Sequence, residues 1–122
     1  MSKSVIDIIN KLDYSIIADH RKDLLKPLHE YVIFKAKQKV EANLNFICTH
    51  NSRRSQIAQV WAKIMSDYYG FNINCFSGGT ITTECNKRTI ASFGRMGFTI
   101  KNPGGENPHY ELTYHEKKKP II

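Results

Sequence analysis

The pattern of hydrophobic and polar positions changes near residue 44. Before that point, apolar residues at helical spacing predict three short helices. The first covers residues 5–12, the second begins at about Ser15, and the third follows Pro27. Pro27 marks either a break or a first helical position. We therefore interpret residues 1–43 as a helical N-terminal extension packed on the main sheet. Nothing in this part of the sequence indicates chemistry.

After residue 44 the pattern alternates between strand and helix. A short apolar run over residues 44–47 predicts a buried strand, and a polar loop follows it. Apolar residues on one helical face over residues 57–68 predict a helix that ends at Gly70. Residues 71–76 predict a second strand, and residues 86–97 predict another helix. This order of elements predicts an α/β fold with a parallel sheet.

The last part of the sequence predicts a small hairpin. Residues 101–108 have the composition of a loop, and Tyr110, Leu112 and Tyr114 alternate with polar residues as in a strand. Residues 115–119 could turn this strand back into residues 120–122. We expect residues 44–122 to form the α/β domain.

Composition limits the functional classes. The 122 residues suit one small domain, and an apolar content of 41% allows a packed core. A net charge of +7 suggests an anionic partner, but the charge is spread along the chain and the only run is residues 117–119, so nucleic-acid binding is not favoured. No apolar stretch approaches the ~18 residues of a membrane-spanning helix.

The three cysteines indicate a reducing environment. Their number is odd and none forms a C-x-x-C motif, so the sequence predicts neither a disulfide framework nor a zinc site, and no metal or cofactor is expected. The cytoplasm is the expected location. Cys75 alternates within a predicted strand and is expected in the core. Cys85 lies near the start of a helix. Two alternatives remain open for it, a thiol with a lowered pKa and a purely structural role.

The loop over residues 48–55 carries the candidate chemistry. Its N–H groups and those at the start of the next helix can converge on one anion. The helix dipole and the Arg54 guanidinium favour the thiolate of Cys48, and Arg54 can hold two oxygens of a tetrahedral anion. Ser55 can donate its hydroxyl to the sulfur, and Asn51 tolerates positive φ. The predicted catalytic residues are Cys48, Arg54 and Ser55, and the predicted phosphate-binding residues are Thr49, His50, Asn51, Ser52, Arg53 and Arg54.

The sequence of this loop resembles that of a known family. Residues 45–56, NFICTHNSRRSQ, resemble the signature loop of the low-molecular-weight protein tyrosine phosphatases and the related thioredoxin-coupled arsenate reductases. Residues 76–80 resemble the segment after their second strand, and residues 86–97 resemble their second helix. The resemblance implies a three-layer α/β fold with the parallel sheet of the low-molecular-weight phosphatase type.

The resemblance also implies roles for loop residues. Cys48 would be the nucleophile that forms a phosphocysteine, Arg54 would stabilise the equatorial oxygens, and Ser55 would help to hold the thiolate. Asn51 would shape the loop, and Gln56 follows the version of the motif found in the reductases.

The sequence departs from the family pattern at three points. His50 replaces the usual glycine, and Arg53 replaces the usual second loop cysteine. The family takes its general acid from a late aspartate, whereas no aspartate of this chain follows Asp67. Residues that could replace it by type alone are Glu106, His109, Glu111 and His115.

The length is short for the family fold, which needs four parallel strands. We therefore expect an incomplete sheet, truncated at the C-terminus. An uncovered edge and apolar face then make self-association into a homo-oligomer plausible.

Three functions remain open on the sequence alone. The first is hydrolysis of phosphomonoesters, on a phosphorylated protein or a small aryl phosphate, which would be weak without the general acid. The second is reduction of arsenate by the same Cys48 nucleophile. The third is a phosphate-binding or anion-binding remnant without turnover.

Overall fold

The computed structural model describes residues 3–51, 53–80, 85–104, 110–114 and 121. A 3₁₀ turn (Tyr14–Ile16) lies between the first two helices. The helices are α1 (Lys3–Asn10), α2 (Asp19–Lys37), α3 (Arg54–Tyr69) and α4 (Lys87–Arg95), and the strands are β1 (Ala42–Cys48), β2 (Ile73–Gly79), β3 (Thr99–Lys101) and β4 (Glu111–Thr113).

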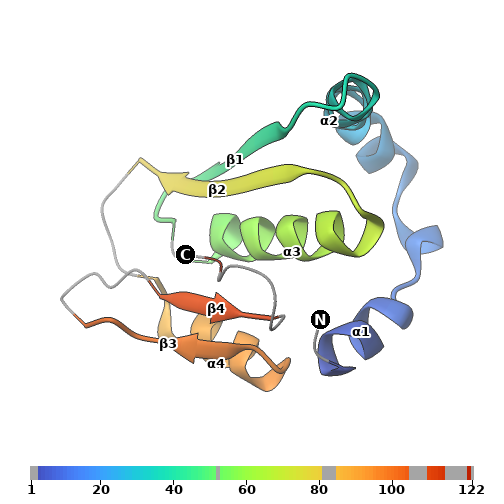
Figure 1. Ribbon diagram of the computed structural model, residues 1–122. Helices are drawn as coiled ribbons and strands as arrows, with labels where there is room; N and C mark the ends of the chain where they lie inside the picture. Colours follow the sequence, from blue (N-terminus) through green and yellow to red (C-terminus); the bar gives the residue numbers. More distant parts are fainter. Residues whose placement is uncertain (1–2, 52, 81–84, 105–109, 115–120, 122) are drawn as a thin grey trace.

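A parallel pair of strands carries the candidate site at one end. β1 and β2 pair in register from Ala42 opposite Ile73 to Cys48 opposite Gly79 (Figure 1). The predicted α/β class with a parallel sheet is confirmed. β2 starts later than predicted and continues through residues 77–79, because small residues there can pair with β1 as it approaches the loop.

Helix α3 packs along one face of this sheet. It begins directly after the polar loop, and Gly70 ends it with a φ of 77°, a left-handed conformation that glycine adopts without strain, as predicted. Val60 and Ile64 are buried on the opposite side of α3, which faces the hydrophobic core. Ile57 belongs to the same apolar pattern but is 42% exposed.

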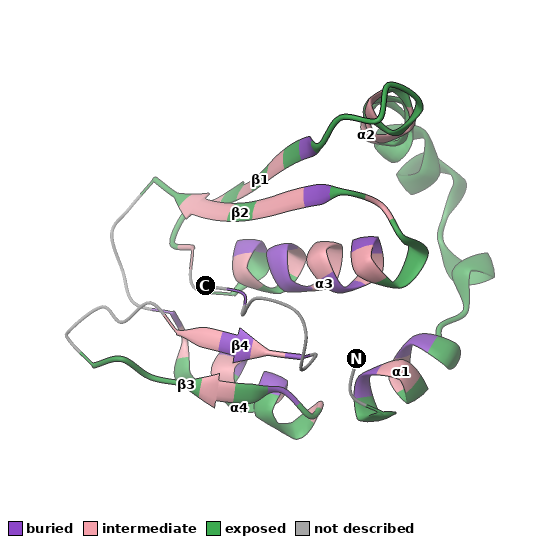
Figure 2. Ribbon diagram, in the orientation of Figure 1, coloured by how far each residue is buried: buried purple, intermediate pink, exposed green. Residues whose placement is uncertain are grey.

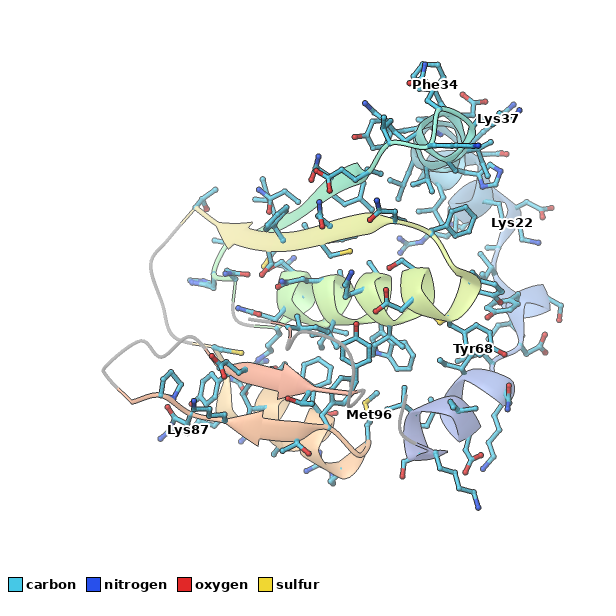
Figure 3. The ribbon with its side chains drawn as sticks, viewed as in Figure 1. Lys22, Phe34, Lys37, Tyr68, Lys87 and Met96 are labelled. Carbon is cyan, nitrogen blue, oxygen red and sulfur yellow. The ribbon has the colours of Figure 1, made fainter. Side chains whose placement is uncertain are left out.

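The hydrophobic core lies on the other side of α3 from the β1–β2 sheet. It joins α1 and α3 to α4 and the β3–β4 hairpin (Figure 2). Its buried members are Val5, Ile9, Val60, Ile64, Phe93, Phe98, Leu112, Tyr114 and Ile121. At the end of α3, the hydroxyl of Tyr68 donates to Asn10 of α1 at 3.3 Å (Figure 3). The predicted packing of the N-terminal helices on the main sheet is therefore wrong for α1, which packs in this core instead, while a domain boundary after residue 43 stays a prediction.

The sequence prediction was wrong for the region around α2. This helix is continuous through Pro27, and the predicted helix at Ser15 is a 3₁₀ turn whose Ser15 N–H is capped by Asp13 at 3.0 Å. Proline costs about 3 kcal/mol inside a helix, chiefly through a missing hydrogen bond and a clash one turn earlier. Pro27 is exposed, so water can serve the unpaired carbonyl of that turn.

No residue of α2 is buried, and side chains such as Phe34 and Lys37 point away from the rest of the molecule (Figure 3). Within the described ranges, no helix combines the length and apolar character needed to cross a bilayer.

The C-terminal part follows the sequence prediction only in part, because β4 pairs with β3 in an antiparallel hairpin. Asn86 caps α4 by accepting from the Arg88 N–H at 2.9 Å, and β4 forms where alternation predicted a strand. β3 was not predicted, because three residues are too few to show a period. Leu112 also pairs with Ile121 in an antiparallel bridge, so the predicted return of the chain is confirmed at that residue.

Candidate active site

The candidate site lies where β1 ends and α3 begins. The chain leaves β1 at Cys48, turns at Asn51 with a φ of 50°, and enters α3 at Arg54. A positive φ is tolerated by asparagine better than by most residues, which explains why this residue type suits the turn. Arg53, at the N-cap, makes no side-chain capping bond, so the first N–H groups of α3 remain suited to an anion.

A chain of side-chain hydrogen bonds runs behind the loop. Ser55 Oγ lies 3.0 Å from Cys48 Sγ and donates to Asn51 Oδ1 at 2.7 Å. A hydroxyl has only one proton, so Ser55 cannot donate to both groups at once. With Cys48 protonated, its S–H can donate to Oγ. When Cys48 ionises, the hydroxyl can turn towards the thiolate instead.

These contacts favour the ionised form of Cys48. The hydrogen bond from the Ser55 side chain, aided by the backbone N–H groups of Ser55 and Asn51 and by the charge of Arg54, lowers the pKa of the Cys48 thiol to about 7. Roughly half of a thiol with such a pKa is thiolate at neutral pH. Cys48 therefore has the chemistry of a nucleophile.

Glutamine side chains fix the backbone around the loop. Gln56 Nε2 donates to the Asn51 carbonyl at 3.0 Å, which ties the turn to the first turn of α3. Gln59 is buried, accepts from Ser77 Oγ at 2.6 Å and donates to the Cys75 carbonyl at 3.1 Å, so α3 is joined to β2. Gln59 and Ser77 were not predicted as functional residues, and their role became evident only from the packing of α3 on β2.

A pocket of about 500 Å³ opens in front of Cys48. Four of the residues that line it were predicted as site residues. The other four were not predicted, and they come from β1, α3 and the end of β2. The lining residues are Phe46, Ile47, Cys48, Thr49, Arg54, Ser55, Ala58 and Thr80. The site thus combines a thiol, a guanidinium and hydroxyls with an apolar wall.

Other predicted residues lie around this pocket rather than in its lining. Asn51 lies behind it, bonded to Ser55, and His50 and Arg53 are exposed on the loop. Ser52 lies outside the described residues.

One of the four substitutes for the general acid can be placed. Glu111 lies in β4 and forms an ion pair with Lys101 of β3 at 3.9 Å. The others, at positions 106, 109 and 115, lie outside the described residues.

The other two cysteines differ from Cys48. Cys75 is half-buried within β2, and burial raises the pKa of its thiol to about 11. Cys85 is buried next to the cap of α4. All three are free thiols. The predicted core position of Cys75 is wrong, because this residue lies half-buried in β2 and outside the hydrophobic core.

Comparison with known proteins bears on the chemistry of this site. One stretch of the chain is 41% identical over 58 residues to the arsenate reductase of Staphylococcus aureus (strain Newman), covering 47% of this chain and 41% of that protein. It is also 37% identical over 57 residues to the arsenate reductase of Bacillus cereus (strain AH187), covering 47% of this chain and 40% of that protein. In this stretch the chain is similar to arsenate reductases.

The likeness to arsenate reductases is partial. The match spans about two fifths of the length of these curated relatives. No family model matches the chain, and no solved structure matches it significantly. Because the named relatives are arsenate reductases, the comparisons favour that alternative over phosphatase activity.

Proposed function

We propose that this chain acts on arsenate and that Cys48 is the nucleophile. The proteins that it resembles are named arsenate reductases. The observation that carries the proposal is the hydrogen bond between Cys48 and Ser55, which with the loop N–H groups lowers the pKa of the thiol to about 7 beside Arg54. Such a site combines a nucleophile with a receptor for a tetrahedral oxyanion.

The proposed first step is attack of the Cys48 thiolate on arsenic. A sulfur–arsenic bond forms, and one arsenate oxygen takes up protons and leaves as water. A second thiolate then attacks Cys48 Sγ, a disulfide forms, and the electron pair of the sulfur–arsenic bond passes to arsenic. Two thiols lose two electrons in total, and arsenic is reduced from the pentavalent to the trivalent state. The roles proposed for this chain are nucleophilic attack by Cys48 and charge stabilisation by Arg54.

The second thiol needs a source. Cys75 pairs with Leu44, four residues from the end of β1 where Cys48 lies, so the two thiols are separated by about 13 Å along the strands. A disulfide requires Cα atoms within about 7 Å. Its half-buried position and raised pKa also make Cys75 a poor attacking thiol. We propose that an external dithiol or thiol protein resolves the Cys48 adduct.

The experiment measures arsenite formed from arsenate in the presence of an excess of a small dithiol. We expect activity in the wild type, none with Cys48→Ser, and activity near wild type with Cys75→Ser and Cys85→Ser combined. Equal arsenite formation by wild type and Cys48→Ser would overturn the proposal. Loss of activity in the double variant, with its fold intact by circular dichroism, would overturn the external thiol.

Hydrolysis of aryl phosphates is a second candidate function. The observation that favours it is the apolar wall of the pocket, where Phe46 and Ile47 lie beside Cys48 and could contact an aromatic group. Aryl leaving groups need the least help from a general acid. With p-nitrophenyl phosphate, Cys48-dependent release of nitrophenol would support this function. Anion binding with neither reaction would indicate a non-catalytic remnant.

A reducing compartment such as the cytoplasm suits a site that depends on a free thiol.

A further inference from the structure

The loop over residues 48–55, called the anion loop below, lies against the end of β2. The backbone N–H of Thr80 donates to the Thr49 carbonyl at 2.9 Å, and Thr80 Oγ1 donates to the same oxygen at 3.3 Å. One residue thus supplies both donors to a carbonyl that directly follows Cys48 in the chain. This arrangement ties the loop to a strand that is itself fixed by pairing with β1.

The two bonds set the direction of a peptide group in the loop. In a trans peptide, the carbonyl and the next N–H point in opposite directions. Holding the Thr49 oxygen on the Thr80 side therefore directs the His50 N–H to the opposite side of the loop. If this peptide turned over, a partly negative oxygen would replace that N–H, and it would repel an oxyanion held by the loop.

Gly79 allows the loop to come this close. A Cβ at this position would lie 2.9 Å from the Asn51 nitrogen and 2.9 Å from the Thr49 oxygen, both backbone atoms. Neither atom can move without shifting the loop. At the neighbouring Gly78, a Cβ would only meet Asn45 Oδ1, at 3.9 Å. The requirement for glycine is therefore one of space and is specific to position 79.

We propose that Gly79 and Thr80 form a latch that holds the loop over residues 49–51 in its anion-binding form. Gly79 is a positioning residue, since it acts through the loop backbone, and Thr80, which also lines the pocket, has its proposed positioning role through the Thr49 carbonyl. The inference rests on the proposed function only in that the site must bind a tetrahedral oxyanion. It assigns a role to two residues at the end of β2, which lie outside the loop motif.

The latch separates two properties of the site. The charge state of Cys48 depends on Ser55, on the Asn51 N–H and on Arg54, whereas both bonds described for Thr80 go to the Thr49 carbonyl. Removing the Thr80 hydroxyl should weaken anion binding while the pKa of Cys48 stays near 7. General damage to the fold would change both properties together.

The experiment measures protection of Cys48 from iodoacetamide by inorganic phosphate, with peptide mass spectrometry reporting on this cysteine alone. We expect Gly79→Ala to weaken phosphate binding about tenfold or more, and Gly78→Ala to change it less than about twofold. Thr80→Val should weaken binding about threefold at an unchanged pH midpoint of alkylation, and Thr80→Ser should restore it. Circular dichroism checks the fold of each variant.

The outcomes distinguish the latch from the site itself. If phosphate protects the wild type but Gly79→Ala and Thr80→Val bind it as tightly, the latch is wrong and the proposed function stands. If phosphate does not protect the wild type, both are wrong. If Gly79→Ala does not fold, Thr80→Val decides: weaker binding at an unchanged midpoint supports the latch, and unchanged binding overturns it.

Discussion

Cys48 and Ser55 lie at opposite ends of the anion loop, with their side chains 3.0 Å apart. This contact is the largest cause of the lowered pKa of Cys48, whose ordinary value is 9.0. Ser55→Ala should raise the pKa, so that the thiolate fraction and the alkylation rate at pH 7 fall about tenfold. Ser66→Ala is the matched control, because Ser66 is buried in the same helix but bonds to Lys63. Equal alkylation rates for the two variants would contradict this role of Ser55.

Asn51 competes with Cys48 for the hydroxyl proton of Ser55. In Asn51→Asp, a carboxylate would accept that proton more strongly and would add negative charge near the sulfur, while the positive φ is still tolerated. We expect the alkylation midpoint of Cys48 to move to higher pH. Asn45→Asp adds the same charge at an exposed position of β1 and should shift the midpoint less. A midpoint in Asn51→Asp at or below that of the wild type would show that this competition is absent.

Arg54 is expected to hold the anion through its planar guanidinium. Arg54→Lys keeps the positive charge but loses the bidentate geometry. Phosphate affinity, measured by calorimetry, should fall about tenfold. Arg95→Lys, in the exposed last turn of α4, makes the same exchange away from the pocket and should leave the affinity unchanged. An unchanged affinity in Arg54→Lys would mean that charge alone suffices.

A part-buried polar contact joins the C-terminal segment to α3. The hydroxyl of Tyr114 donates to the Asp67 carboxylate, which also pairs with Lys63 at 3.6 Å. Burial and the Asp67 carboxylate raise the pKa of Tyr114, so it stays a donor at ordinary pH. Tyr114→Phe should cost about 1–3 kcal/mol in the free energy of unfolding by urea, because a largely buried carboxylate loses a partner. Tyr69→Phe breaks an exposed bond to Tyr14 and should cost much less. Equal losses would contradict the importance of burial here.

The site loop could be predicted from sequence because its geometry is local. A strand, a polar turn with a residue suited to positive φ, and a helix with regularly spaced apolar residues place Cys48, Ser55 and Arg54 together without distant contacts. The end of α3 at Gly70 and the cap of α4 at Asn86 follow for the same reason.

Features that depend on packing could not be predicted. The course of α2 through Pro27 depends on exposure of the carbonyl that proline leaves unpaired. The role of Gly79 depends on how closely β2 approaches the loop. The sequence contains two adjacent glycines and does not indicate which of them lies against the loop. The contact between Tyr114 and Asp67 joins residues far apart in the chain.

The most direct test of the site is the pH dependence of Cys48 alkylation with and without phosphate. The structure predicts a midpoint near pH 7 and protection of Cys48 by the anion, whereas Cys75, with its pKa near 11, should react little in the native protein. A Cys48 midpoint near 9.0, the ordinary value, together with no protection by phosphate, would contradict the account of Cys48 as an activated nucleophile in an anion site.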